Sequence, residues 1–458
     1  MKKLILIRLS LFTLSFSVLS CQEFLDEKPA KYLTVPTSLK DLQAIMNHRN
    51  LFFQNSSTPE VLADNYYLEQ NIWLATTETG GKFFYTWEPN VQSERSWNGL
   101  YKNMVYYPNV VLDQLSNFKE SSENKLLYNR IRGEALFYRA FGFYQLAQLY
   151  CKPYSETAKT DLGIPLRTTA SVETPSVRAT VQETYDKIII DLLLALDLLP
   201  YQSDFPTKPN KAAVYGLLSR CYLSMRDYGN AGKYADLCLK QQSELIDYNT
   251  IKTDSAPFKR FNKETIYYSY CSNTLTVLHS PRARIDTLLY QSYSDKDLRK
   301  KLFFKAMTGA NVGNFEFSGC YDSEYFPNGV FNGITTGEMY LNRAECYART
   351  GKKDLALADL NVLMKNRWDN TVIYPTITAT SADEALEKIL IERRKELVYR
   401  GLRWSDLRRF NLEGRNISLE RNVNGQKYLL TPDDPRWVLL IPDDAINRSE
   451  MPQNPRDQ

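Results

Sequence analysis

The chain has 458 residues, of which 43% are hydrophobic and 24% are charged, and these are ordinary proportions for a globular protein. Its formal net charge is +4, but three of its 57 basic residues and none of its 53 acidic residues lie in positions 1–20, so the remainder is nearly neutral. Without a long basic run, this balance gives no electrostatic case for binding nucleic acid.

The N-terminus has the pattern of a lipoprotein signal peptide. Basic residues precede an apolar run over 9–19, which is too short to span a bilayer but fits the apolar part of a signal peptide. Ser20 directly precedes Cys21, as at a bacterial lipoprotein cleavage site. The pattern predicts a signal peptide over 1–20, a lipid on Cys21 and a tether over 21–36. The alternative is an ordinary signal peptide with a cysteine there by chance.

Helical periodicity dominates the rest of the chain. Apolar residues recur at helical spacing over residues 37–47, 96–115, 126–149 and 180–198. The sequence therefore predicts a mainly α chain in which residues 37–458 form one helical domain.

Two segments share the spacing of tetratricopeptide repeats. Residues 212–241 and 338–367 match at five positions around Tyr222 and Tyr347, and each segment is broken near its middle. Small residues at these offsets let two antiparallel helices approach closely. We predict two tetratricopeptide-like helical hairpins that form a scaffold, and two unrelated hairpins are the alternative.

Two stretches depart from this pattern. Residues 50–89 are irregular, and the insert over 243–337 is rich in Tyr, Ser, Asn, Gly and Phe with frequent turn signals. The end of the chain, 416–458, also looks loop-like. Long irregular segments in a compact protein are usually functional, so we expect a loop-rich ligand-binding region.

Sugar recognition needs aromatic faces beside planar polar groups, because a sugar ring has an apolar face and hydroxyl edges. Both irregular stretches contain such combinations. The candidate ligand contacts are Asp64, Asn65, Tyr66, Tyr67 and Trp73 in the first stretch, and Tyr290, Asn314 and Tyr321 in the second. Trp87 is open to either role, whereas Trp97, Trp368, Trp404 and Trp437 lie in helical or signature segments and are expected in the core.

The cysteines and histidines give no metal signature. Six cysteines follow Cys21 without a C-x-x-C pair, and His48 and His279 are the only histidines. We predict no metal site and no cofactor, with calcium support of a loop left open. The scattered spacing favours buried free thiols, with one disulfide bridge left open.

The charged residues give no catalytic signature either. Neighbouring carboxylates such as Asp433 and Asp434 point apart along the chain, and no nucleophile elbow, phosphate loop or dinucleotide fingerprint is present. The dense charges Glu392, Arg393, Glu396, Arg403, Asp406 and Arg409 are expected to form a structural ion network, with Arg400 as a helical partner of Glu396. We predict that the chain is not an enzyme.

Several motifs together resemble the SusD/RagB family. They are the lipidated-type start at 21–29, WNGLY at 97–101 followed by 109–113, RGEALFYR at 132–139, the charged signature at 392–409, and IP at 441–442 with QNP at 453–455. Together, and in this order, these motifs span essentially the whole chain. One departure is the end, where Arg456 and Asp457 stand in place of a glycine and an aromatic residue.

This resemblance implies a nutrient-binding lipoprotein that is anchored on the outer surface of a bacterial outer membrane. Its partner would be a SusC-like TonB-dependent barrel, and its ligand a glycan or, in some members, a peptide. Two alternatives remain at this point. A helical-repeat scaffold lipoprotein would bind only protein, and a surface hydrolase would cleave glycans or peptides.

Overall fold

The computed structural model describes residues 36–53, 55–252, 256–271, 274–322 and 329–456. The predicted signal peptide, Cys21 and nearly all of the tether lie outside the described residues. No helix of the described residues is long and apolar enough to cross a membrane.

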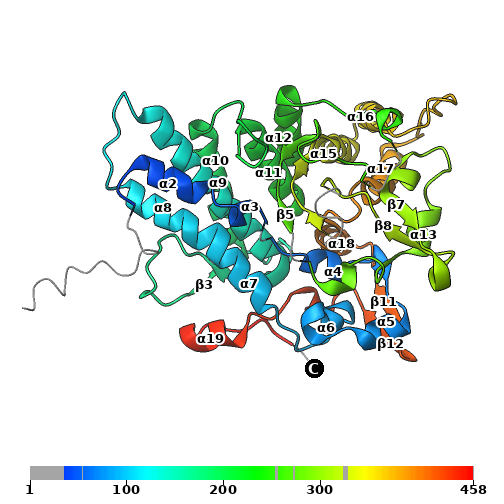
Figure 1. Cartoon of the computed structure of the whole chain (residues 1–458), viewed down its shortest axis with the longest axis horizontal. Helices are drawn as coiled ribbons and strands as arrows, with labels where there is room; N and C mark the ends of the chain where they lie inside the picture. Colours follow the sequence, from blue (N-terminus) through cyan, green and yellow to red (C-terminus); the bar gives the residue numbers. More distant parts are fainter. Residues whose placement is uncertain (1–35, 54, 253–255, 272–273, 323–328, 457–458) are drawn as a thin grey trace, which may run out of the picture.

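Helices dominate the fold, as predicted. The N-terminal helical part contains α2 (Leu39–Met46), α7 (Glu94–Leu100), the π-helix η2 (Tyr101–Tyr106), α8 (Tyr107–Leu115), α9 (Lys125–Tyr150) and α10 (Val181–Leu198). The later helices are α11 (Lys211–Ser224), α12 (Tyr228–Gln241), α15 (Thr336–Arg349), α16 (Lys353–Lys365), α17 (Ala382–Glu396) and α18 (Arg403–Leu412). Figure 1 shows α2 and α8 at the opposite end of the molecule from β7, β8 and α13.

The long helix α9 lies at the centre of the helical part. Almost every residue from Ile131 to Tyr150 is buried, because α8 and α10 pack against it. The charges that α9 buries are paired, as Arg139 is with Asp191 of α10 at 2.8 Å. At its C-terminal end, the guanidinium of Arg408 donates to the carbonyls of Gln148 and Cys151, which places positive charge at the negative end of the helix.

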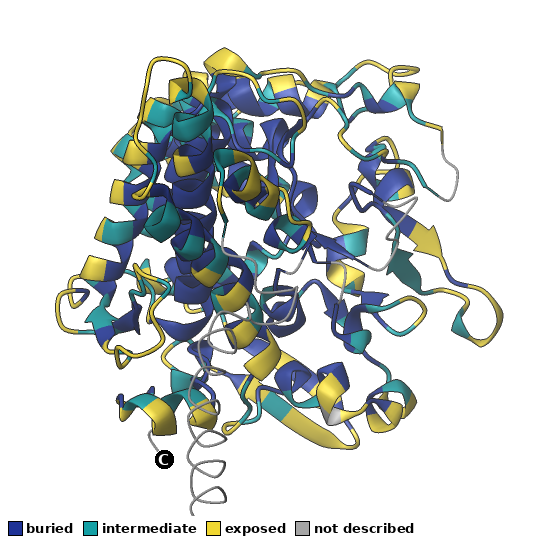
Figure 2. Ribbon diagram, turned by 60° about the vertical axis from the view of Figure 1, so that its left-hand side comes forward, coloured by how far each residue is buried: buried dark blue, intermediate teal, exposed yellow. Residues whose placement is uncertain are grey.

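The two predicted hairpins are present and pack against each other. α11 packs on α12, and α15 packs on α16, at the positions that the repeat spacing predicts. α12 also packs on α15, although the insert separates them in sequence. The buried pair of Arg220 on α11 and Glu338 on α15, 2.6 Å apart, connects the two hairpins. Figure 2 shows buried residues along the inner faces of the helices.

The loop-rich part consists of short helices and two-stranded antiparallel ladders. The short helices include α3 (Asn50–Phe53), α4 (Thr58–Leu62), α5 (Gln70–Ala75), α6 (Lys82–Tyr85), α13 (Thr287–Gln291), α14 (Arg299–Phe303) and α19 (Asp443–Ser449). The ladders pair β1 (Tyr66–Tyr67) with β6 (Arg284–Ile285), β2 (Leu162–Pro165) with β3 (Arg178–Thr180), β4 (Thr265–Tyr267) with β10 (Ile334–Thr335), β5 (Tyr270–Cys271) with β9 (Val330–Phe331), β7 (Phe304–Ala306) with β8 (Phe315–Phe317), and β11 (Leu419–Val423) with β12 (Gln426–Leu430).

Some expectations need correction. The segment 416–458 is not only loop, since it contains the β11–β12 hairpin and α19. Trp97, Trp404 and Trp437 are buried as predicted, but Trp368 is only partly buried. Trp87, open to either role, is a core residue. Its indole N–H donates to the carbonyl of Leu62.

The six described cysteines are free and buried, as expected.

Candidate functional site

The two irregular stretches meet in space. β1, from the first stretch, pairs antiparallel with β6, from the second, so that Tyr67 lies opposite Arg284. The amide of Asp286 donates to the carbonyl of Asn65 over 2.9 Å and extends this pairing. Parts of both stretches are therefore brought together, and β8 of the second stretch also packs against β6.

A hydrogen bond joins one candidate from each stretch. The hydroxyl of Tyr67 donates to Oδ1 of Asn314 over 2.7 Å, and both side chains are half-buried. Beside them, the guanidinium of Arg284 pairs with Glu69 at 2.9 Å and donates to Oδ1 of Asn311 at 2.5 Å. Phenol, amide, guanidinium and carboxylate groups thus stand next to one another, and groups of these kinds can exchange hydrogen bonds with the hydroxyls of a ligand.

A stacked aromatic pair supplies the apolar half. The rings of Tyr290 on α13 and Phe315 on β8 lie 3.6 Å apart with an interplanar angle of 16°. Both residues are half-buried, and the ammonium of Lys300 lies 5.1 Å from the Tyr290 ring centre. Phe315 directly follows Asn314 in the chain, so the ring pair and the Tyr67–Asn314 hydrogen bond are joined through neighbouring residues. We call these four residues the Tyr67–Tyr290 surface.

Trp73 lies on α5 and is 8% exposed. The ammonium of Lys82 is 4.4 Å from its ring centre, and the ring of Tyr428 lies 6.3 Å away. Among the described residues its indole N–H has no hydrogen-bond partner. A buried donor without a partner is costly, but this N–H is itself enclosed, so it offers no surface to a ligand in this structure.

The other candidates support the site from within. Asn65 and Tyr66 are fully buried and Tyr321 is 1% exposed, so their side chains offer almost no surface to a ligand in this structure. Asp64 pairs with Arg403 at 2.8 Å and with Arg394 at 3.2 Å. Burial opposes its ionisation, but the two guanidinium groups outweigh burial and lower the pKa of Asp64 well below its usual range.

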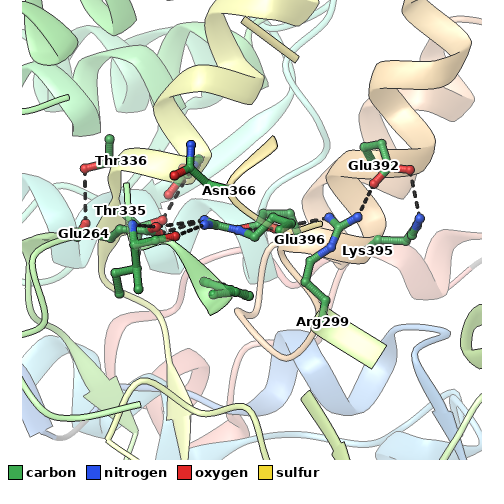
Figure 3. Close-up of polar contacts among 12 residues, drawn as sticks. Glu264, Arg299, Thr335, Thr336, Asn366, Glu392, Lys395 and Glu396 are labelled. Atoms are coloured by element: carbon green, nitrogen blue, oxygen red, sulfur yellow. Dashed lines mark hydrogen bonds and ion pairs between the residues drawn. The ribbon is translucent and has the colours of Figure 1, made fainter. Parts of the chain in front are cut away.

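The predicted charges form a buried ion network, in which Glu392 and Glu396 pair with arginines from other segments. Glu396 pairs with Arg367 at 2.8 Å and with Arg299 at 3.1 Å, and Arg367 also pairs with Glu264 at 2.9 Å. Figure 3 shows the chain of contacts from Glu264 through Glu396 to Glu392. Burial opposes ionisation of Glu396, yet the two arginines outweigh it and lower its pKa. These charges are satisfied by one another, which fits a structural network.

One predicted partner is wrong. Because α17 ends at Glu396, Arg400 does not follow it on a helix, and Glu396 pairs with Arg367 and Arg299 instead. The guanidinium of Arg400 lies 3.6 Å from the centre of the Tyr321 ring. The Tyr321 hydroxyl in turn donates to Glu264 over 2.8 Å.

Sequence reasoning missed two members of the site, Arg284 and Phe315, although Phe315 adjoins a turn signal in the insert. Asn311 was expected among the polar residues of the insert, and it accepts a hydrogen bond from Arg284. Three cavities of about 330 to 410 Å³ also lie elsewhere on the molecule, in helical and C-terminal segments. Among the described residues, no group of three or more His, Cys, Asp and Glu side chains could hold a metal ion.

Comparison with known proteins identifies the family of the chain. Residues 23–223 match the family described as starch-binding and associating with the outer membrane, and residues 240–455 match the SusD family. The chain belongs to the SusD/RagB family. The SusD-like protein P2 of Formosa agariphila is 30% identical over 124 residues, which are 27% of this chain and only 23% of that protein's length.

Solved SusD-like structures share the fold over nearly their whole length. A SusD superfamily protein from Bacteroides thetaiotaomicron superposes with a TM-score of 0.77 at 21% identity, covering 92% of this chain and 100% of that one. A SusD-like carbohydrate-binding protein from Bacteroides vulgatus gives 0.68 at 22% identity, covering 90% and 97%. A SusD superfamily protein from Bacteroides fragilis gives 0.73 at 21% identity, covering 91% and 99%. At these identities the likeness establishes the fold.

Proposed function

We propose that this SusD/RagB protein is a lipid-anchored receptor at the cell surface that captures a glycan and passes it to a SusC-like TonB-dependent outer-membrane barrel. It binds without cleaving. The observation that carries the glycan proposal is the Tyr67–Tyr290 surface, where the stacked Tyr290–Phe315 pair adjoins the Tyr67–Asn314 hydrogen bond. An aromatic face beside planar polar groups matches the two faces of a sugar ring.

The comparisons support the outer-membrane location and the glycan ligand in this proposal. One matching family is described as starch-binding and associating with the outer membrane. One solved structure of the same fold is named a SusD-like carbohydrate-binding protein. The sequence pattern at Cys21 supplies a lipid attachment point, and a lipid chain contributes about 0.8 kcal/mol of membrane affinity for each buried CH₂ group.

A native affinity gel tests glycan capture. The purified protein is run in gels that contain starch, laminarin, xylan, polygalacturonate, alginate or chondroitin sulfate, and each polysaccharide is then assayed for shortened products. We expect retardation by at least one polysaccharide without product release. Migration unchanged in all six gels would contradict glycan binding, and product release would contradict the non-catalytic role.

The packed hairpins favour a second candidate function. α11, α12, α15 and α16 form a continuous helical stack of the kind that protein-interaction repeats use. A protein-binding scaffold, or a receptor for peptides, would leave all six gels unaffected but would bind a peptide library or the barrel itself. Calorimetry with peptides and co-purification with the barrel distinguish these two outcomes.

A further inference from the structure

A cavity of about 410 Å³ has none of the four residues of the Tyr67–Tyr290 surface in its lining. It opens between the π-helix η2 and the segment 165–176 that follows β2. The side chains that matter for its chemistry are Trp97, Asn98, Lys102, Tyr106 and Arg167. Its volume is in the range of roughly 300 to 1,000 Å³ that is typical of small-molecule sites.

The π-helix at its wall is an unusual feature. Six residues, Tyr101–Tyr106, adopt the wider turn between α7 and α8. π-helical turns are rare and occur frequently at functional sites. Asn103, Met104 and Val105 of this turn are buried, whereas Lys102 and Tyr106 are exposed and line the cavity. One side of the turn therefore packs in the core, and the other side places the Tyr106 ring and the Lys102 ammonium group at the cavity.

Hydrogen bonds hold the two walls of this cavity together. The hydroxyl of Tyr101 on η2 donates to the carbonyl of Pro165 across the cavity over 2.8 Å. The amide of Asn109 donates to the carbonyls of Arg167 at 2.9 Å and Thr169 at 3.2 Å. Preformed walls lower the ordering cost of binding, because a ligand does not have to assemble them.

Aromatic rings form the apolar part of the lining. The rings of Trp97 and Tyr101 lie 4.7 Å apart, and Trp97 is 5% exposed. Tyr106 is 42% exposed, so a sugar ring can reach its face. Asn98, four residues before Lys102, is exposed on the same side and adds an amide. This combination of an accessible ring and planar polar groups suits a carbohydrate.

The charge of the lining indicates which kind of carbohydrate the cavity would favour. Lys102 and Arg167 are its charged members, and none of the described residues that line it is acidic. Arg167 donates to the carbonyls of Thr174, at 2.7 Å, and Ser171, and to the Ser176 hydroxyl at 3.1 Å. These bonds fix the guanidinium, and no acidic side chain among the described lining residues balances its charge. Unbalanced cations beside a ring favour an anionic group on the ligand.

We propose that this cavity is a second carbohydrate site, which takes an acidic sugar unit of the captured glycan. The inference rests on the proposed glycan-binding function. An acidic sugar would stack on Tyr106, accept hydrogen bonds from Asn98 and place its negative group near Lys102 and Arg167. Two separate sites on one rigid protein would hold a polymer by avidity, which raises affinity without new contacts at either site.

The test uses gels that contain polygalacturonate, alginate or chondroitin sulfate, with starch as the neutral comparison. Tyr106→Ala and Lys102→Gln are compared with Tyr201→Ala, which removes another exposed tyrosine, and with Lys263→Gln, which makes the same charge change outside the cavity. We expect an acidic polysaccharide to retard the protein, and each cavity variant to lower its affinity about tenfold. Both control variants should match the unmodified protein.

The outcomes separate this inference from the proposed function. Retardation by starch alone overturns the acidic site but leaves glycan capture in place. Retardation by an acidic polysaccharide that is unchanged in both cavity variants also overturns it. If no polysaccharide retards the unmodified protein, both proposals fail together. Thermal melting of each variant confirms that the half-exposed Tyr106 and exposed Lys102 were replaced without loss of the fold.

Discussion

Arg367 illustrates how single residues hold this fold together. Its side chain is fully buried, and its guanidinium donates to Glu264, Glu396 and the carbonyl of Ile246. We predict that Arg367→Met lowers the free energy of unfolding by about 3–5 kcal/mol, because the buried carboxylates of Glu264 and Glu396 both lose a charged partner.

Chemical denaturation measures this loss. The control is Arg448→Met, which breaks an exposed pair with Asp444 at 3.1 Å and should cost about 0–1 kcal/mol. Similar losses for the two variants would contradict the structural role that we assign to the network.

Glu60 makes stability depend on pH. Burial raises the pKa of Glu60 from 4.5 to about 7, although Asn65 and the amide of Gly401 donate to it and oppose the shift. Between these values the folded protein keeps a proton that the unfolded chain has released, so stability falls as pH rises from 4.5 to 7. The shift corresponds to roughly 3 kcal/mol.

Melting temperatures across this pH window test the assignment. Glu60→Gln cannot ionise, so its stability should fall less between pH 4.5 and 7 than that of the unmodified protein. The comparison concerns the slope with pH, since the amide also alters two hydrogen bonds. Parallel curves for the two proteins would show that Glu60 is not the titrating group.

At the residue scale, the structural role of the charged side chains could be predicted from the sequence. The exposure of individual aromatic side chains could not. The charged signature at 392–409 was expected to be a structural network, because buried charges must pair. Tyr66 and Tyr67 are adjacent and chemically identical, yet one is fully buried and the other half-buried. That difference arises from the pairing of β1 with β6, which joins residues more than two hundred positions apart.

At the scale of elements, helices with strong local signals were predictable. Thr180 caps α10 with a reciprocal bond to Glu183, so the predicted start at 180 matches the helix. The π-turn of η2 was not predicted, because its apolar spacing fits an ordinary helix. The β11–β12 hairpin was also missed, although Asn424-Gly425, with both residues at positive φ, is a strong hairpin turn signal.

The contact between the two hairpins depends on a glycine. A β-carbon at Gly232 on α12 would lie 2.9 Å from Cβ of Cys346 on α15, whereas one at Gly229 would meet nothing closer than 3.5 Å. Alanine gains about 1 kcal/mol of helix propensity over glycine at either position. We therefore predict that Gly232→Ala is less stable than Gly229→Ala by about 1–3 kcal/mol, because overpacking outweighs that gain.

Denaturation of both glycine variants measures the difference. Equal stability would mean that α12 and α15 can separate without cost, and that the hairpins do not act as one scaffold. A larger side chain at 232, as in Gly232→Leu, should increase the loss, since more volume must be accommodated at the same contact.

At the scale of the whole molecule, lipid anchoring is the expectation that lies outside the described residues. Cys21→Ser removes the predicted attachment point, and the protein should then leave the membrane fraction, because the lipid on Cys21 is the proposed anchor. Fractionation of cells that express each form measures this. Retention of the serine variant in the membrane fraction, after a wash at high salt, would contradict the anchor.

The spatial arrangement of the binding region could not be foreseen from the sequence. The family motifs indicated a helical receptor with a loop-rich ligand region, and both the family and the helical fold are confirmed. Nothing in the sequence, however, placed Tyr67 against Asn314 or stacked Tyr290 on Phe315. These contacts depend on how two short ladders dock, and short strands carry little sequence signal of their own.

The measurement that tests glycan capture most directly is a calorimetric titration with an oligosaccharide from the polysaccharide that retards the protein. The unmodified protein is compared with Tyr67→Ala and Tyr290→Ala, and with Tyr201→Ala as an exposed control. We predict that each site variant loses about 1–2 kcal/mol, roughly five- to thirtyfold in affinity, while the control is unchanged. Unaltered affinity in both site variants would show that the glycan does not bind at the Tyr67–Tyr290 surface.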